Sequence, residues 1–437
     1  MSRSCPALFI AAPSSNQGKT TVTCAIARHL TNQGKKVRIF KTGPDYLDPQ
    51  ILQQASRQPV IQLDLWMCGL EYCEQALYDA AKDADLILIE GAMGLFDGQP
   101  SSADLAKQFN IPIAVIMDVK GAAQTVGAVL LGLKTYRDDI SITHFIANNC
   151  GSNRHKELIE EAMPKDIKFW FNLARDENIK LPERHLGLVQ AEEVTELLEE
   201  QFNYTADKII ADDDLLNSIK PIEFKQPKIE PKEIKPLLKN KTVAIAKDVA
   251  FNFIYEENIN ALKDLGANVV FFSPLNDKHL PKCDSIWLPG GYPELHAKQI
   301  SENKTLIKDI QTHFKNKKSV FAECGGFMTC LESLTDLEGN TYAMFDLMQG
   351  QASMRGKRGC QGMQSLTVPF EGLENDKIKG HAHHRSRADN TPEPITYGIR
   401  QRHPAPGEAI FQQDGLVASY LHVFFRSNME LVGRLLA

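Results

Sequence analysis

The chain has 437 residues, of which 43% are hydrophobic and 24% are charged, and its formal net charge is −6. This length exceeds what one hydrophobic core normally serves and predicts two domains, while the acidic balance argues against a nucleic-acid surface. The nine cysteines are scattered without a CxxC pair, which favours reduced thiols over a disulfide framework. The longest weakly polar stretch, residues 121–133, is too short to span a bilayer, so we expect a soluble cytoplasmic protein.

Apolar runs alternate with helical patterns through residues 1–217. Runs typical of strands occur at residues 7–12, 37–40, 86–90, 113–118, 143–148 and 185–189, and helices are expected at 19–33 and within the acidic stretch 190–215. Strands that alternate with helices indicate a parallel, doubly wound sheet. Residues 218–241 hold four prolines and many lysines, which is a linker composition.

The alternation restarts after this linker. Strands are expected at residues 242–246, 268–272, 285–291 and 319–323, and helices near 252–265 and 301–316. The sequence therefore predicts a second α/β domain over residues 242–437.

A phosphate-loop motif follows the first expected strand. Residues 13–21, PSSNQGKTT, match GxxxxGK[ST] except that Pro13 replaces the first glycine, and Gly18, Lys19, Thr20 and Thr21 open the following helix. In such a loop the backbone N–H groups and the helix N-terminus bind phosphate oxygens. The lysine reaches the outer phosphates and the threonine hydroxyl at position 20 binds Mg²⁺, so the pattern predicts nucleotide binding.

Polar residues at other strand ends extend this prediction. Asp45 and Asp48 follow the second strand, and Glu90 ends a very apolar strand, where open α/β sheets bind ligands and a carboxylate can hold magnesium. Turn capping is the alternative for the two aspartates, and an ordinary strand-end charge is the alternative for Glu90. Lys41 is either a second phosphate contact or a surface lysine, and Asn148 is a candidate for reading the nucleotide base.

A cysteine in residues 319–326, SVFAECGG, has the pattern of a nucleophile on a strand-to-helix turn. The N–H of Gly325 would face a developing oxyanion, and a second donor could come from Gly290 or Gly291 in the segment LPGGYPE. We expect the helix N-terminus and an imidazole, best supplied by His422, to lower the pKa of the Cys324 thiol. The alternatives are a buried structural thiol and a core histidine.

Two basic segments, residues 354–359 and 380–387, are open to different interpretations. The segment GHAHHRSR lacks the spacing expected of a metal site. We expect a loop here, which would either contact anionic groups such as the carboxylates of a substrate or have only a surface or structural role.

Six segments together carry a family resemblance. In chain order they are GKTT, GPDYLDP, EGAMGLFDG, PGGYPELHA, AECGGFM and ASYLH, and they span nearly the whole chain. The chain resembles the cobyrinic acid and hydrogenobyrinic acid a,c-diamide synthases. This resemblance implies an N-terminal P-loop amidoligase domain of the dethiobiotin-synthetase type, fused to a class I glutamine amidotransferase domain.

The resemblance also implies roles for the motif residues. Cys324 would be the nucleophile that His422 activates, and Asp45, Asp48 and Asp97 would belong to the acidic motifs around an acyl-phosphate step. ATP, Mg²⁺, L-glutamine and a corrin-type macrocycle are the implied cofactors and substrates, and a homodimer is left open. The chain departs from the family pattern at Pro13, at residues 381–387, where HxFHYS is frequent, and at Phe424, where many class I amidotransferases carry a glutamate.

Two other functions stay open at this point. One keeps the chemistry and changes the substrate to nickel-sirohydrochlorin or another tetrapyrrole. The other is a P-loop ATPase or binding module with a degenerate second domain, against which the combination of AECGG and ASYLH argues.

Overall fold

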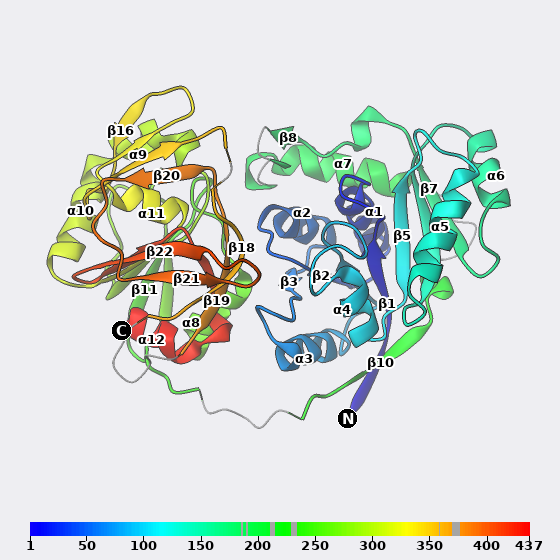
Figure 1. Ribbon diagram of the computed structural model, residues 1–437, viewed down its shortest axis with the longest axis horizontal. Helices are drawn as coiled ribbons and strands as arrows, with labels where there is room; N and C mark the ends of the chain where they lie inside the picture. The colour runs from blue at the N-terminus through cyan, green and yellow to red at the C-terminus, as the bar shows by residue number, and fades with distance from the viewer. Residues whose placement is uncertain (185–186, 189–190, 210–214, 229–233, 358, 369–375) are drawn as a thin grey trace. The chain divides into compact units, whose positions relative to one another are not determined.

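A computed structural model describes the chain except for residues 185–186, 189–190, 210–214, 229–233, 358 and 369–375 (Figure 1). The chain divides into two compact units, Met1–Glu230 and Pro231–Ala437. Each unit is built around its own sheet, as the alternation of strands and helices predicts.

Eight described strands of the first unit form one sheet in the order β3-β2-β4-β1-β5-β6-β7, with β10 paired to β1. All pairs are parallel except β1–β10. The strands are β1 (Ser2–Ala11), β2 (Val37–Lys41), β3 (Ile61–Gln62), β4 (Leu86–Glu90), β5 (Ile113–Asp118), β6 (Ile142–Cys150), β7 (Lys168–Ala174) and β10 (Pro221–Lys225). The central β4, sequence LILIE, is buried along its whole length, as expected for a strand covered on both faces.

Helices cover both faces of this sheet because neighbouring residues of each strand point to opposite sides. Leu8 and Ile10 of β1 pack with α1, α2 and α7, whereas Ala7 and Phe9 pack with α3, α4, α5 and α6. The helices are α1 (Lys19–Asn32), α2 (Leu47–Ser56), α3 (Leu70–Ala80), α4 (Ser102–Gln108), α5 (Thr125–Tyr136), α6 (Asn153–Glu161) and α7 (Thr195–Asp207). Short 3₁₀ turns lie at Glu177–Ile179, Ala191–Glu193 and Leu216–Ser218.

Two sequence-based expectations for the first unit differ from its structure. Part of the expected linker, residues 221–225, forms β10 and pairs antiparallel with residues 2–6 of β1. Of the expected strand 185–189, only β9 (Gly187–Leu188) lies within the described residues, where it pairs with β8 (Glu183–Arg184) in a separate two-stranded sheet. Alternating apolar residues in β10 explain the first difference, since its Phe224 joins the core.

Ten described strands of the second unit form a mixed sheet in the order β12-β11-β13-β14-β23-β22-β21-β18-β19-β24. The first five are mutually parallel and the others pair antiparallel. They are β11 (Thr242–Ala246), β12 (Asn268–Phe272), β13 (Ser285–Leu288), β14 (Ser319–Glu323), β18 (Gln361–Leu366), β19 (Ile378–His383), β21 (Thr396–Arg400), β22 (Pro406–Gln413), β23 (Leu416–Ser419) and β24 (His422–Phe424). A smaller sheet contains β15 (Ser333–Thr335), β16 (Thr341–Ala343), β17 (Gln351–Met354) and β20 (Ser386–Asp389).

Two apolar clusters lie on opposite faces of the large sheet. One includes residues of α9, α10 and α11, and the other includes residues of α8 and α12. The helices are α8 (Glu256–Asp264), α9 (Ala297–Glu302), α10 (Lys304–Lys315), α11 (Gly325–Cys330) and α12 (Met429–Leu435), with 3₁₀ turns η4 (Pro293–His296) and η5 (Phe425–Ser427). The parallel half was expected from the sequence, whereas the antiparallel half was not.

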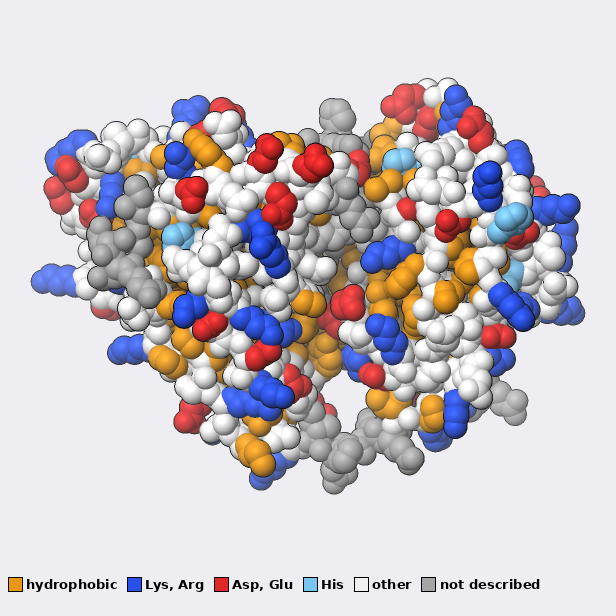
Figure 2. All heavy atoms as spheres, turned by 180° about the vertical axis from the view of Figure 1, so that it is seen from behind, with side chains coloured by type: hydrophobic (Ala, Val, Ile, Leu, Met, Phe, Trp, Pro, Cys, Tyr) orange, Lys and Arg blue, Asp and Glu red, His pale blue; other side chains and the backbone are white. Residues whose placement is uncertain are grey.

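Acidic and basic side chains are interspersed over the face of each unit that Figure 2 shows. Within the described residues, no helix combines the length and the apolar character that crossing a membrane requires.

Candidate active sites

The loop between β1 and α1 has the backbone form of a phosphate cradle. Gly18, directly before α1, has a φ of 89°, and a Cβ atom there would lie 2.1 Å from Nδ2 of Asn148. Asn148, at the end of β6, donates from Nδ2 to the carbonyl of Gln17 at 3.1 Å. Glycine is therefore required at position 18 by both its φ and its neighbour. Asn148 supports the loop, and a contact between Asn148 and a nucleotide base stays a prediction.

The first turn of α1 carries the lysine and threonines of the motif. Lys19 donates from Nζ to the carbonyl of Met93 at 2.8 Å, and burial together with the nearby charge of Lys41 lowers its pKa. Thr20 donates from Oγ1 to Oε1 of Glu90 at 3.1 Å. Thr21 is half-buried in the same turn. The first N–H groups of the helix lack intrahelical partners, so they can bind an anion at this end.

A buried ion-pair cluster lies where β2 and β4 end. Lys41 stands opposite Glu90 in the parallel register, and its Nζ lies 2.9 Å from Oδ2 of Asp48 and 3.1 Å from Oε1 of Glu90. Burial opposes the charged form of Lys41, but the charges of Asp48 and Glu90 raise its pKa overall. Lys41 is only 3% exposed, so it is not a surface lysine.

Glu90 is more than an ordinary charge at a strand end. It is completely buried, and burial raises the pKa of its carboxyl group. Its Oε1 accepts hydrogen bonds from Thr20 and Lys41, whereas its Oε2 has no hydrogen-bond partner among the described residues. A buried carboxylate oxygen without a partner is unfavourable unless a ligand completes the site.

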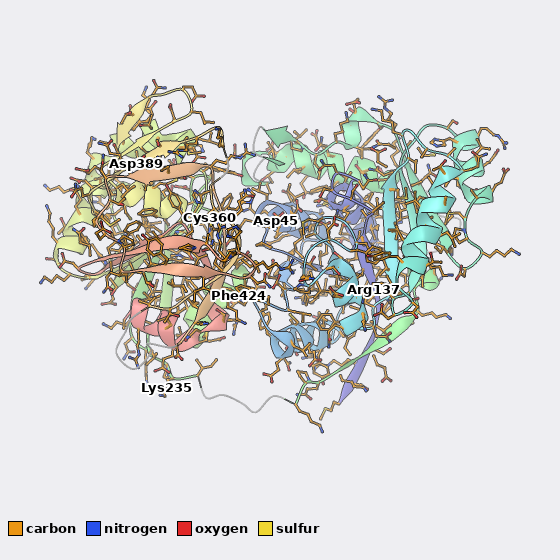
Figure 3. All side chains as sticks on the ribbon, viewed as in Figure 1. Asp45, Arg137, Lys235, Cys360, Asp389 and Phe424 are labelled. Carbon is orange, nitrogen blue, oxygen red and sulfur yellow. The ribbon has the colours of Figure 1, made fainter. Side chains whose placement is uncertain are left out.

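Asp45 caps the turn before α2 with one of its two carboxylate oxygens, which was the alternative to a role in the active site. Its Oδ1 accepts the backbone N–H groups of Leu47 at 2.9 Å and Asp48 at 3.0 Å, and so stabilises the start of α2. Burial, and then the like charge of Asp48, raise its pKa to about 7. Asp45 therefore sits in the loop that leads into α2, where Figure 3 labels it, with one oxygen committed to the backbone.

Asp97 belongs to the same region through the loop after β4. Its Oδ2 accepts the N–H of Gly94 at 3.0 Å, and a Cβ atom on Gly94 would lie 2.7 Å from the carbonyl of Pro13. The charge of Asp97 also reaches Lys19. The structure thus gathers the predicted acidic residues of the first unit around one phosphate loop.

The second candidate site is centred on a sharp turn at Cys324. This residue lies between β14 and α11 and has φ 46° and ψ −105°, a conformation that non-glycine residues rarely adopt. Its N–H donates to the carbonyl of Ser419 at 2.8 Å. A Cβ atom on Gly326 would lie 2.0 Å from the carbonyl of Leu288, so the turn needs glycine there. The strand-to-helix turn that the sequence predicts is present.

Glycines after β13 lie against this turn and against the predicted base. A Cβ atom on Gly325 would lie 3.1 Å from the backbone nitrogen of Gly291, and one on Gly290 would lie 2.2 Å from Cε1 of His422. The backbones of Gly291 and Gly325 therefore lie against one another, and the use of their N–H groups as two oxyanion donors stays a prediction. Gly290 also makes room for the imidazole, and its predicted role as an oxyanion donor stays a prediction.

The carboxylate of Glu323, which precedes Cys324 in the chain, holds β24, the strand that carries His422. Glu323 accepts the N–H of Val423 on Oε1 at 2.7 Å and the indole N–H of Trp287 on Oε2 at 2.9 Å. Burial raises its pKa to about 8. Phe424, labelled in Figure 3, is fully buried and packs edge-to-face on Tyr255, so the position that is acidic in many class I amidotransferases is a core position here.

The ionisation of the pair differs from the expectation. Burial, followed by the charge of Glu294, raises the pKa of the Cys324 thiol. Burial, followed by the proximity of His381, lowers the pKa of His422 well below its usual range. The predicted lowering of the thiol pKa is therefore wrong for this structure, because desolvation outweighs the N–H of Gly325. Because the pKa of the Cys324 thiol is raised, attack by its sulfur requires a group that takes up the proton.

The histidines of GHAHHRSR lie in β19 and at its end, which corrects the expectation of a loop. His381 pairs with His422 across β19 and β24, and the two rings stack with centroids 5.1 Å apart. His384 lies 2.9 Å from Oε1 of Glu408 and stacks on Tyr420 with centroids 4.0 Å apart. His381 therefore packs directly on the imidazole of His422.

Sequence reasoning missed the residues that act through burial. Glu323 and Glu294 were assigned no role, although they lie inside AECGG and PGGYPE. The only available signal was a carboxylate within an otherwise apolar or glycine-rich run, which is unusual for a buried strand or turn.

Comparisons with known proteins cover both units of the chain. Residues 8–189 match the CobQ/CobB/MinD/ParA nucleotide binding domain, and residues 242–430 match the CobB/CobQ-like glutamine amidotransferase domain. The chain is 42% identical over 428 residues to the hydrogenobyrinate a,c-diamide synthase of Stutzerimonas stutzeri. The aligned region covers 98% of this chain and 97% of that protein. The chain is 41% identical over 429 residues to the cobyrinate a,c-diamide synthase of Herminiimonas arsenicoxydans, covering 98% and 96%, respectively. The resemblance predicted from the six motifs is confirmed, and the chain belongs to the family of the hydrogenobyrinate and cobyrinate a,c-diamide synthases.

Proposed function

We propose that this protein uses ATP and glutamine to amidate the a and c acetate carboxylates of hydrogenobyrinate or cobyrinate in cobalamin biosynthesis. One observation carries the proposal. A chain that matches these synthases along almost its whole length also holds a phosphate loop next to a buried Lys41–Asp48–Glu90 cluster, and a strained Cys324 turn with His422 nearby. Relatives of nearly equal identity carry both substrate names, so both macrocycles are candidates.

The first unit would activate the carboxylate. A carboxylate is a poor electrophile, and transfer of the γ-phosphoryl group of ATP to it makes an acyl phosphate with a good leaving group. Lys19 and the N–H groups of the loop would hold the phosphates and offset the charge that moves during transfer. Lys41, held by Asp48 and Glu90, adds a fixed positive charge at the same strand edge.

The donor set also fits a magnesium ion. The Thr20 hydroxyl and the unpartnered Oε2 of Glu90 supply the hard oxygen ligands that Mg²⁺ prefers, and the ion when bound would neutralise phosphate charge. Asp45 and Asp48 would position the substrate side of the site.

The second unit would supply ammonia. The Sγ of Cys324 attacks the carboxamide carbon of glutamine while its proton passes to His422, and the oxygen takes up negative charge beside the N–H groups of Gly291 and Gly325. Collapse breaks the carbon–nitrogen bond, the proton from His422 joins the leaving nitrogen, and a thioester and ammonia result. Water then hydrolyses the thioester to glutamate and restores the thiol. One oxyanion donor typically contributes about 2.7–4 kcal/mol to such a transition state.

The test measures diamide formation with glutamine and, separately, with ammonium chloride. Cys324→Ala is expected to lose glutamine-dependent synthesis and keep the ammonium-dependent reaction, because free ammonia replaces the delivered kind. Lys19→Ala is expected to lose both, because no acyl phosphate forms. Full glutamine-dependent activity in Cys324→Ala would refute the nucleophile, and a wild-type protein that amidates neither macrocycle would refute the proposed substrates.

The remaining features of the protein stay predictions. A cytoplasmic location is supported by nine cysteines that are all free thiols and by the need for ATP. A homodimer and the absence of nucleic-acid binding are open to measurement by sedimentation.

A further inference from the structure

Glu294 is a buried carboxylate next to the Cys324 turn that the mechanism above does not use. It is the second residue of η4, directly after the loop that supplies Gly290 and Gly291. Its neighbour Pro293 packs on the turn, since a Cβ atom on Gly325 would lie 2.8 Å from Cδ of Pro293. Only 8% of Glu294 is exposed, and its charge is the one that acts most strongly on the Cys324 thiol. The carboxylate therefore lies near the turn at which glutamine must present its amide.

No group among the described residues compensates the charge of Glu294. Neither a hydrogen bond from another residue nor an ion pair reaches its carboxylate in the described part of the chain, and its own backbone N–H is the one group that favours ionisation. Burial accordingly raises its pKa to about 7. A buried carboxylate without a partner is strongly unfavourable, and a cationic group on a ligand would remove this penalty.

The other carboxylates near Cys324 are already committed. Both oxygens of Glu323 accept hydrogen bonds, from Val423 and Trp287. Glu408 is paired with His384. Glu294 is the remaining buried acid among the three carboxylates whose charges act on the thiol.

Glutamine brings a cation of the required kind. It is a zwitterion, and a short carbon chain joins its reacting amide to an α-ammonium group. When the amide reaches Sγ, that ammonium loses water and needs a hydrogen-bond acceptor inside the protein. We propose that the Glu294 carboxylate receives the α-ammonium group of glutamine and thereby selects glutamine over amides that lack it. This inference rests on the proposed glutamine hydrolysis at Cys324.

The test combines a change in the protein with the matching change in the substrate. We would measure kcat/KM for hydrolysis of glutamine and of glutaramate, which has the same terminal amide and carboxylate but no α-amino group. The variant Glu294→Gln keeps the size of the side chain and removes its charge. Glu302→Gln, on the exposed end of α9 in the same unit, is the matched control.

The expected result is a selective loss. Hydrogen bonds to charged groups contribute about 1.5–3 kcal/mol, so Glu294→Gln should lower kcat/KM for glutamine roughly ten- to hundredfold. Its kcat/KM for glutaramate should fall far less, because glutaramate has no ammonium group to lose a partner. A site that binds a polar group rejects an analogue without it, so the wild type should prefer glutamine and the variant should lose that preference.

A binding measurement complements the kinetics. In Cys324→Ala protein, which cannot turn over, calorimetric titration should show that Glu294→Gln weakens glutamine binding far more than glutaramate binding. Equal losses for both amides would overturn the proposal, because Glu294 would then act on the thiol, the imidazole or the fold. No loss for either amide would also overturn it. A wild-type protein that does not hydrolyse glutamine would instead refute the proposed function.

Discussion

Gly290→Ala is the sharpest single test of where the imidazole lies. A Cβ atom at position 290 would lie 2.2 Å from Cε1 and 3.0 Å from Nδ1 of His422. Carbon atoms pack best at about 3.5–4.0 Å, so the ring must move by roughly 1 Å or more. It cannot do so freely, because His381 stacks on its ring and Glu323 holds the N–H of Val423 next to it.

The expected magnitude follows from this displacement. Moving a catalytic group by about 1 Å can lower the rate about 10²-fold, so glutamine-dependent diamide formation should fall by that order. The ammonium-dependent reaction should be unchanged, since it needs no thiol chemistry. The assay is diamide formation with each nitrogen source, together with circular dichroism to show that the variant folds.

The matched control is Gly356→Ala. Gly356 lies exposed in the same unit, and a Cβ atom there would have nothing within 4 Å. This variant should behave as the wild type with both nitrogen sources. Full glutamine-dependent activity in Gly290→Ala would refute the reasoning, because the base would then tolerate a side chain where the structure leaves no room.

Three further predictions concern other residues. Asp48→Asn removes the charged partner 2.9 Å from Lys41. It should therefore reduce amidation roughly ten- to hundredfold while glutamine hydrolysis largely persists; an unchanged diamide yield would place Asp48 outside the active site. Gly18→Ala should weaken ATP binding, measured by nucleotide titration, because a Cβ atom meets Asn148 at 2.1 Å and the φ of 89° is strained. If the clash matters in addition to φ, Gly18→Ala/Asn148→Ala should bind ATP better than Gly18→Ala, and equal affinities would argue against it. Glu323→Gln cannot accept hydrogen bonds at both ends and should lower the free energy of unfolding by about 1–3 kcal/mol, followed by the fluorescence of Trp287 in a Trp66→Phe/Trp170→Phe background. Because burial raises the pKa of Glu323 from 4.5 to about 8, the folded state binds its proton more tightly, and the advantage of the wild type over the variant should shrink as pH rises through that window; an advantage that grows with pH would contradict this.

Local sequence patterns were enough to predict a phosphate-binding loop and a cysteine nucleophile. GKTT after an apolar run and AECGG after another each encode a strand, a tight turn and a helix, because the required residues are contiguous and glycine is needed where the backbone turns sharply. The strand-end position of Glu90 was likewise readable, since parallel strands present their carboxyl ends at one edge. These features pointed to both candidate sites and identified the family without any knowledge of long-range pairing.

Tertiary structure alone decided how these residues behave. Lys41 was ambiguous until the pairing of β2 with β4 buried it against Glu90 and Asp48. His381 gained its place beside His422 only through the antiparallel pairing of β19 with β24, and Gly290 gained its role from the ring that lies over it. Desolvation raises the pKa of Cys324, and it depends on everything packed around the turn. Residues distant in sequence set each of these outcomes, and one sequence without its contacts does not reveal which of them meet.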